Sequence, residues 1–245
     1  MANTVSWYWD KGNFREKNED SFSVQRVKMN PSGIPAFFTK KGMEAAMLVV
    51  CDGIGGLPEG EAASGFAAEE LTKWFYREGM KCMKSLFWQR TAAECAIKAF
   101  ASVQKKLEQI EKEENVCCGT TCTMALVKGK GFVIVHIGDS RAYRIGGRER
   151  ILTREHQEGG ILRRCLGAFG FQVPDVLCGR LRKGEMLLLG TDGFYRFTDA
   201  GFFRGCFPKR ASDASEYYRK LKSVGSFLRA QGEKDNMTAV LYQRG

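Results

Sequence analysis

The chain has 245 residues, 44% of them hydrophobic, and a formal net charge of +10. Proline is scarce and no linker composition interrupts the sequence, so we expect one globular domain over residues 1–245. No segment approaches the ~18 consecutive apolar residues of a membrane span, and the first residues lack a signal-peptide pattern. These features predict a soluble, cytoplasmic, monomeric protein that does not bind membranes.

The positive charge does not identify a partner. Basic residues occur as isolated pairs such as Lys40-Lys41 and Arg163-Arg164, without interleaved aromatic residues. This pattern favours solvated faces over a nucleic-acid surface, so we expect no nucleic-acid partner.

The nine cysteines show no Cys-x-x-Cys spacing. The cluster of Cys117, Cys118 and Cys122 has no nearby fourth ligand for a soft metal, so we expect buried free thiols there. No cysteine begins a Cys-x5-Arg loop, which argues against a cysteine nucleophile for phosphoryl chemistry.

Predicted strands and helices occur in groups along the chain. We expect strands at 5–9, 21–27, 36–39 and 47–51, then helices at 61–76 and 91–112; strands follow at 121–127, 131–137, 142–145, 151–153 and 186–190, with a helix at 215–231 and a strand at 238–243. Grouped strands with short hairpin turns, plus consecutive long helices, predict an α+β fold of antiparallel sheets covered by helices.

Acidic residues follow several apolar strands. Asp52, Asp139 and Asp192 each come directly after such a run, and Asp235 precedes another. Because an unpaired buried carboxylate is costly, a hard cation such as Mg²⁺ or Mn²⁺ would make these placements favourable. Any single Asp-Gly after a strand is more often only a turn, so the prediction of one shared metal centre rests on the combination.

Two further residues, Glu19 and Arg15, could act together with these carboxylates in catalysis. Glu19, next to Asp20, supplies another carboxylate, and Arg15 precedes it by four residues. A pair of divalent ions can lower the pKa of a bound water and align it with phosphorus, while a guanidinium can contact two phosphate oxygens. With only two histidines, a histidine-rich zinc site is not expected.

The ordered motifs resemble the metal-dependent protein phosphatases of the PP2C (PPM) family over nearly the whole chain. They are Arg15-Glu-Lys-Asn-Glu-Asp20, Asp52-Gly-Ile-Gly-Gly56 with Gly60-Glu61, Gly119-Thr-Thr121, Gly138-Asp-Ser-Arg141, Leu152-Thr-Arg-Glu-His156, Leu189-Gly-Thr-Asp-Gly193 and Asp235-Asn-Met-Thr238. The resemblance implies a β-sandwich of two antiparallel sheets flanked by helices, in four αββα layers. It also implies direct hydrolysis of phosphoserine or phosphothreonine in proteins by metal-activated hydroxide, in opposition to a Ser/Thr kinase.

The resemblance also implies roles for individual residues. Asp52 would bridge two Mn²⁺ or Mg²⁺ ions, Gly53 (through its carbonyl) and Glu19 would complete one site, and Asp192 and Asp235 would hold the other. Asp139 matches a position that, with Asp192, forms a third and weaker metal site in bacterial members. Arg15 matches the phosphate-binding arginine. Arg15, Asp52 and Asp192 are therefore the expected catalytic residues.

Three departures from the family pattern affect these expectations. Ile54 stands where eukaryotic relatives carry a histidine proposed as the general acid, so leaving-group protonation must come from metal-bound water or another side chain. Thr191 replaces a serine before Asp192, and the segment after His156 is short, so we expect a reduced helical segment and flap there. Structural roles are expected for His156 and for His136, which lies on an apolar strand.

Two other functions remain open at this point. A catalytically silent protein could keep the fold and act by binding or regulation, although inactive relatives would be expected to lose metal carboxylates. A basic nucleic-acid-binding protein or metal-dependent nuclease would be supported only by the net charge.

Overall fold

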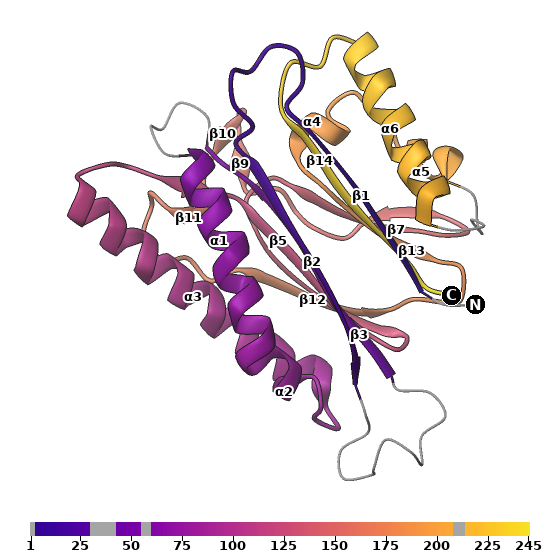
Figure 1. Ribbon diagram of the computed structural model, residues 1–245, viewed down its shortest axis with the longest axis horizontal. Helices are drawn as coiled ribbons and strands as arrows, with labels where there is room; N and C mark the ends of the chain where they lie inside the picture. Colours follow the sequence, from indigo (N-terminus) through magenta and orange to yellow (C-terminus); the bar gives the residue numbers. More distant parts are fainter. Residues whose placement is uncertain (1–2, 30–42, 55–59, 208–213) are drawn as a thin grey trace.

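Two antiparallel five-stranded sheets pack face to face in the computed structural model, which describes residues 3–29, 43–54, 60–207 and 214–245 (Figure 1). The first sheet contains, in spatial order, β1 (Thr4–Asp10), β14 (Met237–Gln243), β13 (Met186–Gly190), β7 (Arg141–Ile145) and β8 (Glu149–Ile151). The second contains β12 (Asp175–Arg180), β6 (Gly131–Ile137), β5 (Cys122–Lys128), β3 (Met43–Asp52) and β2 (Asp20–Met29). The expected β-sandwich is confirmed.

Helices cover the outer face of each sheet (Figure 1). The second sheet is covered by α1 (Gly60–Trp74), α2 (Met80–Cys82) and α3 (Trp88–Glu114), with a π-helical turn η2 (Phe75–Gly79) between the first two. The first sheet is covered by α4 (Asp192–Tyr195), α5 (Phe202–Cys206) and α6 (Ala214–Ala230). The order of layers is therefore helix, sheet, sheet, helix, as the resemblance implied.

The apolar sequence of β3 reflects its position between two cores. Met47 and Val49 belong to the core under α1 and α3, whereas Leu48 and Val50 belong to the core between the sheets. Because successive side chains of a strand point to opposite faces, a strand covered on both sides is apolar at most positions. The same argument applies to β6 and β13, whose observed bounds match the predicted 131–137 and 186–190.

Other predicted elements differ in their bounds or could not be checked. The helix expected at 61–76 gives way to η2 at Phe75, and the helix expected at 91–112 begins earlier, at Trp88. The strand expected at 151–153 is instead β8 (Glu149–Ile151). The strand expected at 36–39 lies outside the described residues.

The sequence predicts a reduced helical segment after His156, but the structure has no helix between His156 and β12. Three two-residue strands occupy it: β9 (Gln157–Glu158), β10 (Ile161–Leu162) and β11 (Leu166–Gly167). β9 pairs with β10, and β11 pairs with β4 (Gly119–Thr120). The pairing of β11 with β4 places this segment near the end of β3, because Thr120 of β4 also forms a bridge with Gly53.

The cysteines only partly match the expectation of buried free thiols. Cys118 and Cys122 are buried and free, but Cys117 is exposed. Cys82 and Cys95 form a disulfide between α2 and α3, which the sequence spacing did not indicate. None of the described helices combines the length and apolar character that crossing a bilayer requires.

Candidate metal centre

The ends of several strands bring the predicted carboxylates to one end of the sandwich. Asp20 begins β2 and Asp52 ends β3, and the two residues are direct partners in the antiparallel ladder. Asp139 follows β6, Asp192 follows β13, and Asp235 precedes β14. The carboxyl group of Asp52 interacts electrostatically with those of Asp20, Asp192, Asp139 and Asp235, so the topology gathers residues far apart in sequence.

Burial and mutual repulsion raise the pKa values of this carboxylate group. Burial, followed by repulsion from Asp20 and the other carboxylates, raises the pKa of Asp52 well above its usual range. Burial raises the pKa of Asp20 to about 7 and that of Asp139 to about 6, with repulsion from Asp192 adding to both. Burial also raises the pKa of Asp192, although the nearby Arg196 opposes this effect. Cations nearby would stabilise all four ionised forms.

The carboxylates of this group are suitable ligands for hard divalent cations. Each of them offers oxygen atoms, the ligand atoms that Mg²⁺ and Mn²⁺ prefer. The Oδ1 atom of Asp20 is buried and has no hydrogen-bond partner among the described residues. In the described part of the chain, no three acidic, His or Cys side chains converge closely enough to form a ready-made ion site. Two arginines instead contact the carboxylates.

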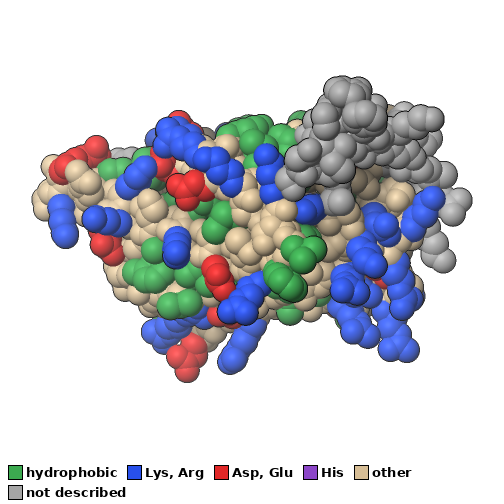
Figure 2. Space-filling view, turned by 90° about the horizontal axis from the view of Figure 1, so that it is seen from below, with side chains coloured by type: hydrophobic (Ala, Val, Ile, Leu, Met, Phe, Trp, Pro, Cys, Tyr) green, Lys and Arg blue, Asp and Glu red, His purple; other side chains and the backbone are tan. Residues whose placement is uncertain are grey.

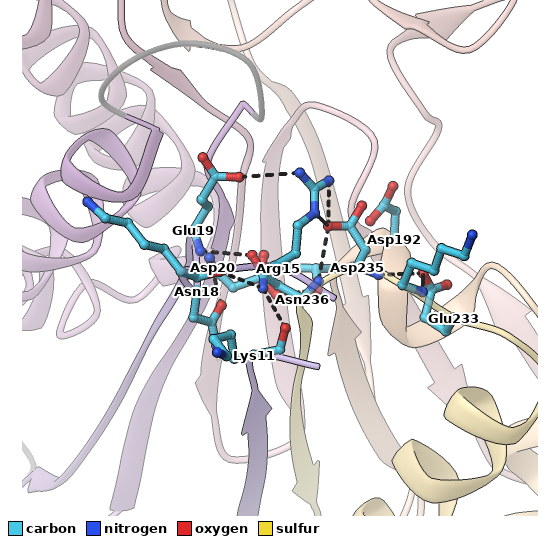
Figure 3. Close-up of polar contacts among 12 residues, drawn as sticks. Lys11, Arg15, Asn18, Glu19, Asp20, Asp192, Glu233, Asp235 and Asn236 are labelled. Atoms are coloured by element: carbon cyan, nitrogen blue, oxygen red, sulfur yellow. Dashed lines mark hydrogen bonds and ion pairs between the residues drawn. The ribbon is translucent and has the colours of Figure 1, made fainter. Parts of the chain in front are cut away.

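Arg15 lies at the solvent-facing side of this group, between Glu19 and Asp235 (Figure 3). Its Nε donates a hydrogen bond to Oδ1 of Asp235 over 2.9 Å, and its Nη1 lies 3.9 Å from Oε2 of Glu19. The side chain is 42% exposed, so a phosphate arriving from solvent can reach it. A phosphate contact of Arg15 stays a prediction.

Arg196 is a second cation in the centre, which sequence reasoning did not single out. It lies one helical turn after Asp192 and forms an ion pair with that carboxylate. It also lies 3.4 Å from Oδ2 of Asp235 and 3.0 Å from Oε1 of Glu233. Its i, i+4 spacing from Asp192 was a visible signal, since residues at this separation share one helix face. Arg196 thus partly neutralises the side of the centre formed by α4.

Two other residues, to which the sequence analysis assigned no role, form hydrogen bonds just before β14. The buried Glu233 accepts hydrogen bonds from the backbone N–H groups of Lys234 and Asp235, each over 2.8 Å. Asn236 accepts a 2.8 Å hydrogen bond from the backbone N–H of Glu19 and donates to the carbonyl of Lys11 (Figure 3). These contacts fix Asp235 and Glu19 relative to one another.

The Gly119-Thr-Thr121 motif supports the backbone at Asp52. The N–H of Thr121 donates to the Asp52 carbonyl over 2.8 Å, and its hydroxyl accepts from the Asp52 N–H over 3.0 Å. At Gly53 an added Cβ would lie 2.3 Å from the carbonyl oxygen of Gly60. Only glycine therefore allows the end of β3 to approach the start of α1 this closely.

The turn that carries Asp139 is also held from several sides. The Tyr195 hydroxyl donates to the Asp139 carbonyl over 2.8 Å, and the hydroxyl of Ser140 hydrogen-bonds that of Thr121. Arg141 pairs with Glu155, which connects this turn to the segment before β9. The residues around Asp139 therefore orient it without occupying its carboxylate.

Both histidines have structural contacts. His136 is buried, receives a hydrogen bond at Nδ1 from Thr123 over 2.8 Å and donates through Nε2 to the Arg154 carbonyl over 3.0 Å. His156 accepts the Gly138 N–H at Nδ1, and its Nε2 lies 3.1 Å from Oδ2 of Asp175. The expected core role of His136 is confirmed.

Comparisons with known proteins agree with this architecture. The sequence profile described as protein phosphatase 2C matches residues 36–241. A serine/threonine phosphatase of Listeria monocytogenes is 23% identical over 269 residues, which cover 96% of this chain and 93% of the relative.

Two solved structures superimpose over nearly the whole chain. A variant of a bacterial serine phosphatase is 26% identical, with a TM-score of 0.77 and 98% of each chain covered. A serine/threonine phosphatase from Staphylococcus aureus is 24% identical, with a TM-score of 0.80, 100% of this chain and 96% of the other covered. On the strength of the profile match, supported by this fold, the chain belongs to the protein phosphatase 2C family.

Proposed function

We propose that this chain is a metal-dependent protein serine/threonine phosphatase whose catalytic domain spans residues 1–245. The observation that carries the proposal is the group of carboxylates at one end of the sandwich, whose burial and, after it, mutual repulsion raise the pKa of Asp52. Such an arrangement is costly unless cations compensate it. Membership of a phosphatase family and similarity to serine/threonine phosphatases support phosphorylated Ser and Thr side chains of proteins as the substrate class.

The residues that would hold two or three Mn²⁺ or Mg²⁺ ions are Glu19, Asp52, the Gly53 carbonyl, Asp139, Asp192 and Asp235. Ions bound there would supply Lewis-acid polarisation of a water molecule and of the phosphoryl oxygens.

The side chains around these ligands have separate tasks. Arg15 reaches the solvent-facing side and would bind the substrate phosphate through its guanidinium fork. The Thr191 hydroxyl donates to Oδ2 of Asp20 over 2.8 Å, which holds this carboxylate and leaves its Oδ1 as an acceptor for a water molecule. Ile54 has no proton to donate, so it cannot protonate the leaving serine or threonine oxygen.

The decisive experiment measures turnover of a phosphothreonine peptide and p-nitrophenyl phosphate with Mn²⁺ and with EDTA. We expect EDTA to abolish activity and Asp192→Ala to lower kcat by orders of magnitude, because a ligand of the catalytic ions is lost. Asp199→Ala is the matched control, since this exposed carboxylate lies outside the centre and only seven residues away.

Each outcome separates the proposal from its rivals. Activity that survives EDTA would refute metal dependence. Mn²⁺ binding by the intact protein without turnover of either substrate would favour a silent binding protein. An equal loss of activity in both variants would show that removal of a nearby negative charge, and not of a ligand, causes the effect.

A further inference from the structure

A basic pocket lies away from the carboxylates, where the β5–β6 turn meets the loop before β13. Its volume is about 530 Å³, and six basic side chains line it: Lys130, Arg144, Arg180, Arg182, Lys183 and Arg244. Buried Leu181 contributes an apolar surface. The volume lies within the range of sites that bind small molecules. The six cations come from four separate parts of the sequence, so the dispersed linear pattern did not predict this cluster.

This basic pocket and the metal centre lie at opposite ends of the sandwich. β14 (Met237–Gln243) connects Asn236, beside the carboxylates, to Arg244, beside the basic pocket. At a strand rise of ~3.3 Å per residue, this path is about 25 Å long. A ligand in the basic pocket would therefore contact neither Arg15 nor the carboxylates.

Backbone hydrogen bonds hold the wall of the basic pocket in place. The Leu181 N–H donates to the Lys130 carbonyl over 2.7 Å, which joins the β5–β6 turn to the loop before β13. The Gly184 N–H donates to the Arg244 carbonyl over 2.7 Å, and Nη1 of Arg244 donates to the Leu181 carbonyl over 3.3 Å. A ligand would thus meet a largely formed surface and lose little affinity to ordering of the backbone.

The charge of the basic pocket is mostly uncompensated. Glu185 pairs with Arg144 over 3.3 Å, and its carboxylate also accepts a 2.8 Å hydrogen bond from the Arg182 backbone N–H. Among the described residues, no carboxylate forms an ion pair with the other five basic side chains. Figure 2 shows Lys and Arg side chains gathered toward the right-hand end of the visible face, with few acidic ones among them. Such a concentration of positive charge attracts anions.

We propose that the basic pocket binds a compact anion that carries two or more phosphate groups. Guanidinium groups match phosphate oxygens in a fork geometry, and several cations converging on one cavity favour a multiply charged ligand. Among the described residues, the lining has no aromatic side chain on which a base could stack, which argues against single-stranded nucleic acid. This inference does not depend on the proposed phosphatase activity.

Isothermal titration calorimetry with tripolyphosphate tests the inference on the full chain. EDTA in the buffer prevents chelated metal from contributing, and sodium chloride keeps the ionic strength constant. We expect one binding site in the wild type and roughly 100-fold weaker binding by Arg180→Gln/Arg182→Gln, because two charge-assisted contacts are removed. The matched control Lys98→Gln/Lys105→Gln changes the net charge equally on exposed positions of α3.

The outcomes decide the location and the class of ligand. Unchanged affinity in Lys98→Gln/Lys105→Gln and in Asp192→Ala, together with the loss in the pocket variant, would support the basic pocket. Absence of binding by the wild type, or equal loss in both double variants, would overturn it. Tighter binding of a single-stranded oligonucleotide that the pocket variant abolishes would replace the compact anion by nucleic acid. Unfolding temperatures of all variants establish that each one is folded.

Discussion

His136 should make the stability of this protein depend on pH in a way that one substitution removes. Its ring is buried between Thr123 and Arg154, and it lies 4.9 Å from the ring of His156. Burial, with a smaller contribution from His156, lowers the pKa of His136 from 6.5 to about 4. The folded protein therefore holds this side chain neutral under conditions in which the unfolded chain already protonates it.

The sign and size of the effect follow from proton linkage. Above pH 6.5 both states are neutral at this residue, and its contribution to stability is fully present. As the pH falls toward about 4, the unfolded state binds the proton first, so the free energy of unfolding decreases. The complete difference corresponds to about 3 kcal/mol, of which about 2 kcal/mol is already lost at about pH 5.

Urea denaturation of the wild type and of His136→Gln across this pH range tests the reasoning. The variant should be less stable at neutral pH, because it loses packing and hydrogen bonds, but the gap should narrow by about 2 kcal/mol near pH 5. Subtracting the two curves removes the contributions of carboxylates common to both proteins. A gap that stays constant or widens on acidification would refute the assignment of this pH dependence to His136.

Three further substitutions probe the centre and its supports. Arg196→Gln should tighten Mn²⁺ binding by about tenfold or more in calorimetry, because a competing cation is removed, and unchanged affinity would contradict this role. Gly193→Ala would place a Cβ 2.1 Å from the Asn236 carbonyl oxygen, so calorimetry should show weaker Mn²⁺ binding; wild-type affinity would exclude this clash. Gly225→Ala would place a Cβ 2.5 Å from the ring of Tyr8 and should lower the free energy of unfolding by about 1–3 kcal/mol in urea, with an unchanged midpoint as the contrary result.

The central strands were predictable because each is covered on both faces. β6 and β13 appear in the sequence as short apolar runs, and their predicted bounds match the structure. β12 was missed for the opposite reason. It is an edge strand with mostly exposed side chains, so burial imposes no regular pattern on Asp175–Arg180.

In the site, too, residues with a local sequence pattern were predictable, whereas residues that act through tertiary contacts were not. Asp52 and Asp192 could be singled out because a charge at the end of an apolar strand is unusual. Glu233 could not, and Asn236 appeared only inside a motif without a role, since both act through contacts with backbone groups that depend on the folded chain. The basic pocket could not be predicted for the same reason, because its basic side chains come from separate strands and loops that only the fold brings together.

The place of β14 between β1 and β13 also has a consequence for biosynthesis. This strand is synthesised after the other strands of the sandwich, yet it lies inside its sheet and directly follows Asp235 and Asn236. Until it inserts, β1 and β13 both lack their neighbour, and the amide that holds Glu19 is missing. A nascent chain therefore cannot assemble the acidic centre, and with it the proposed metal site, before β14 is in place.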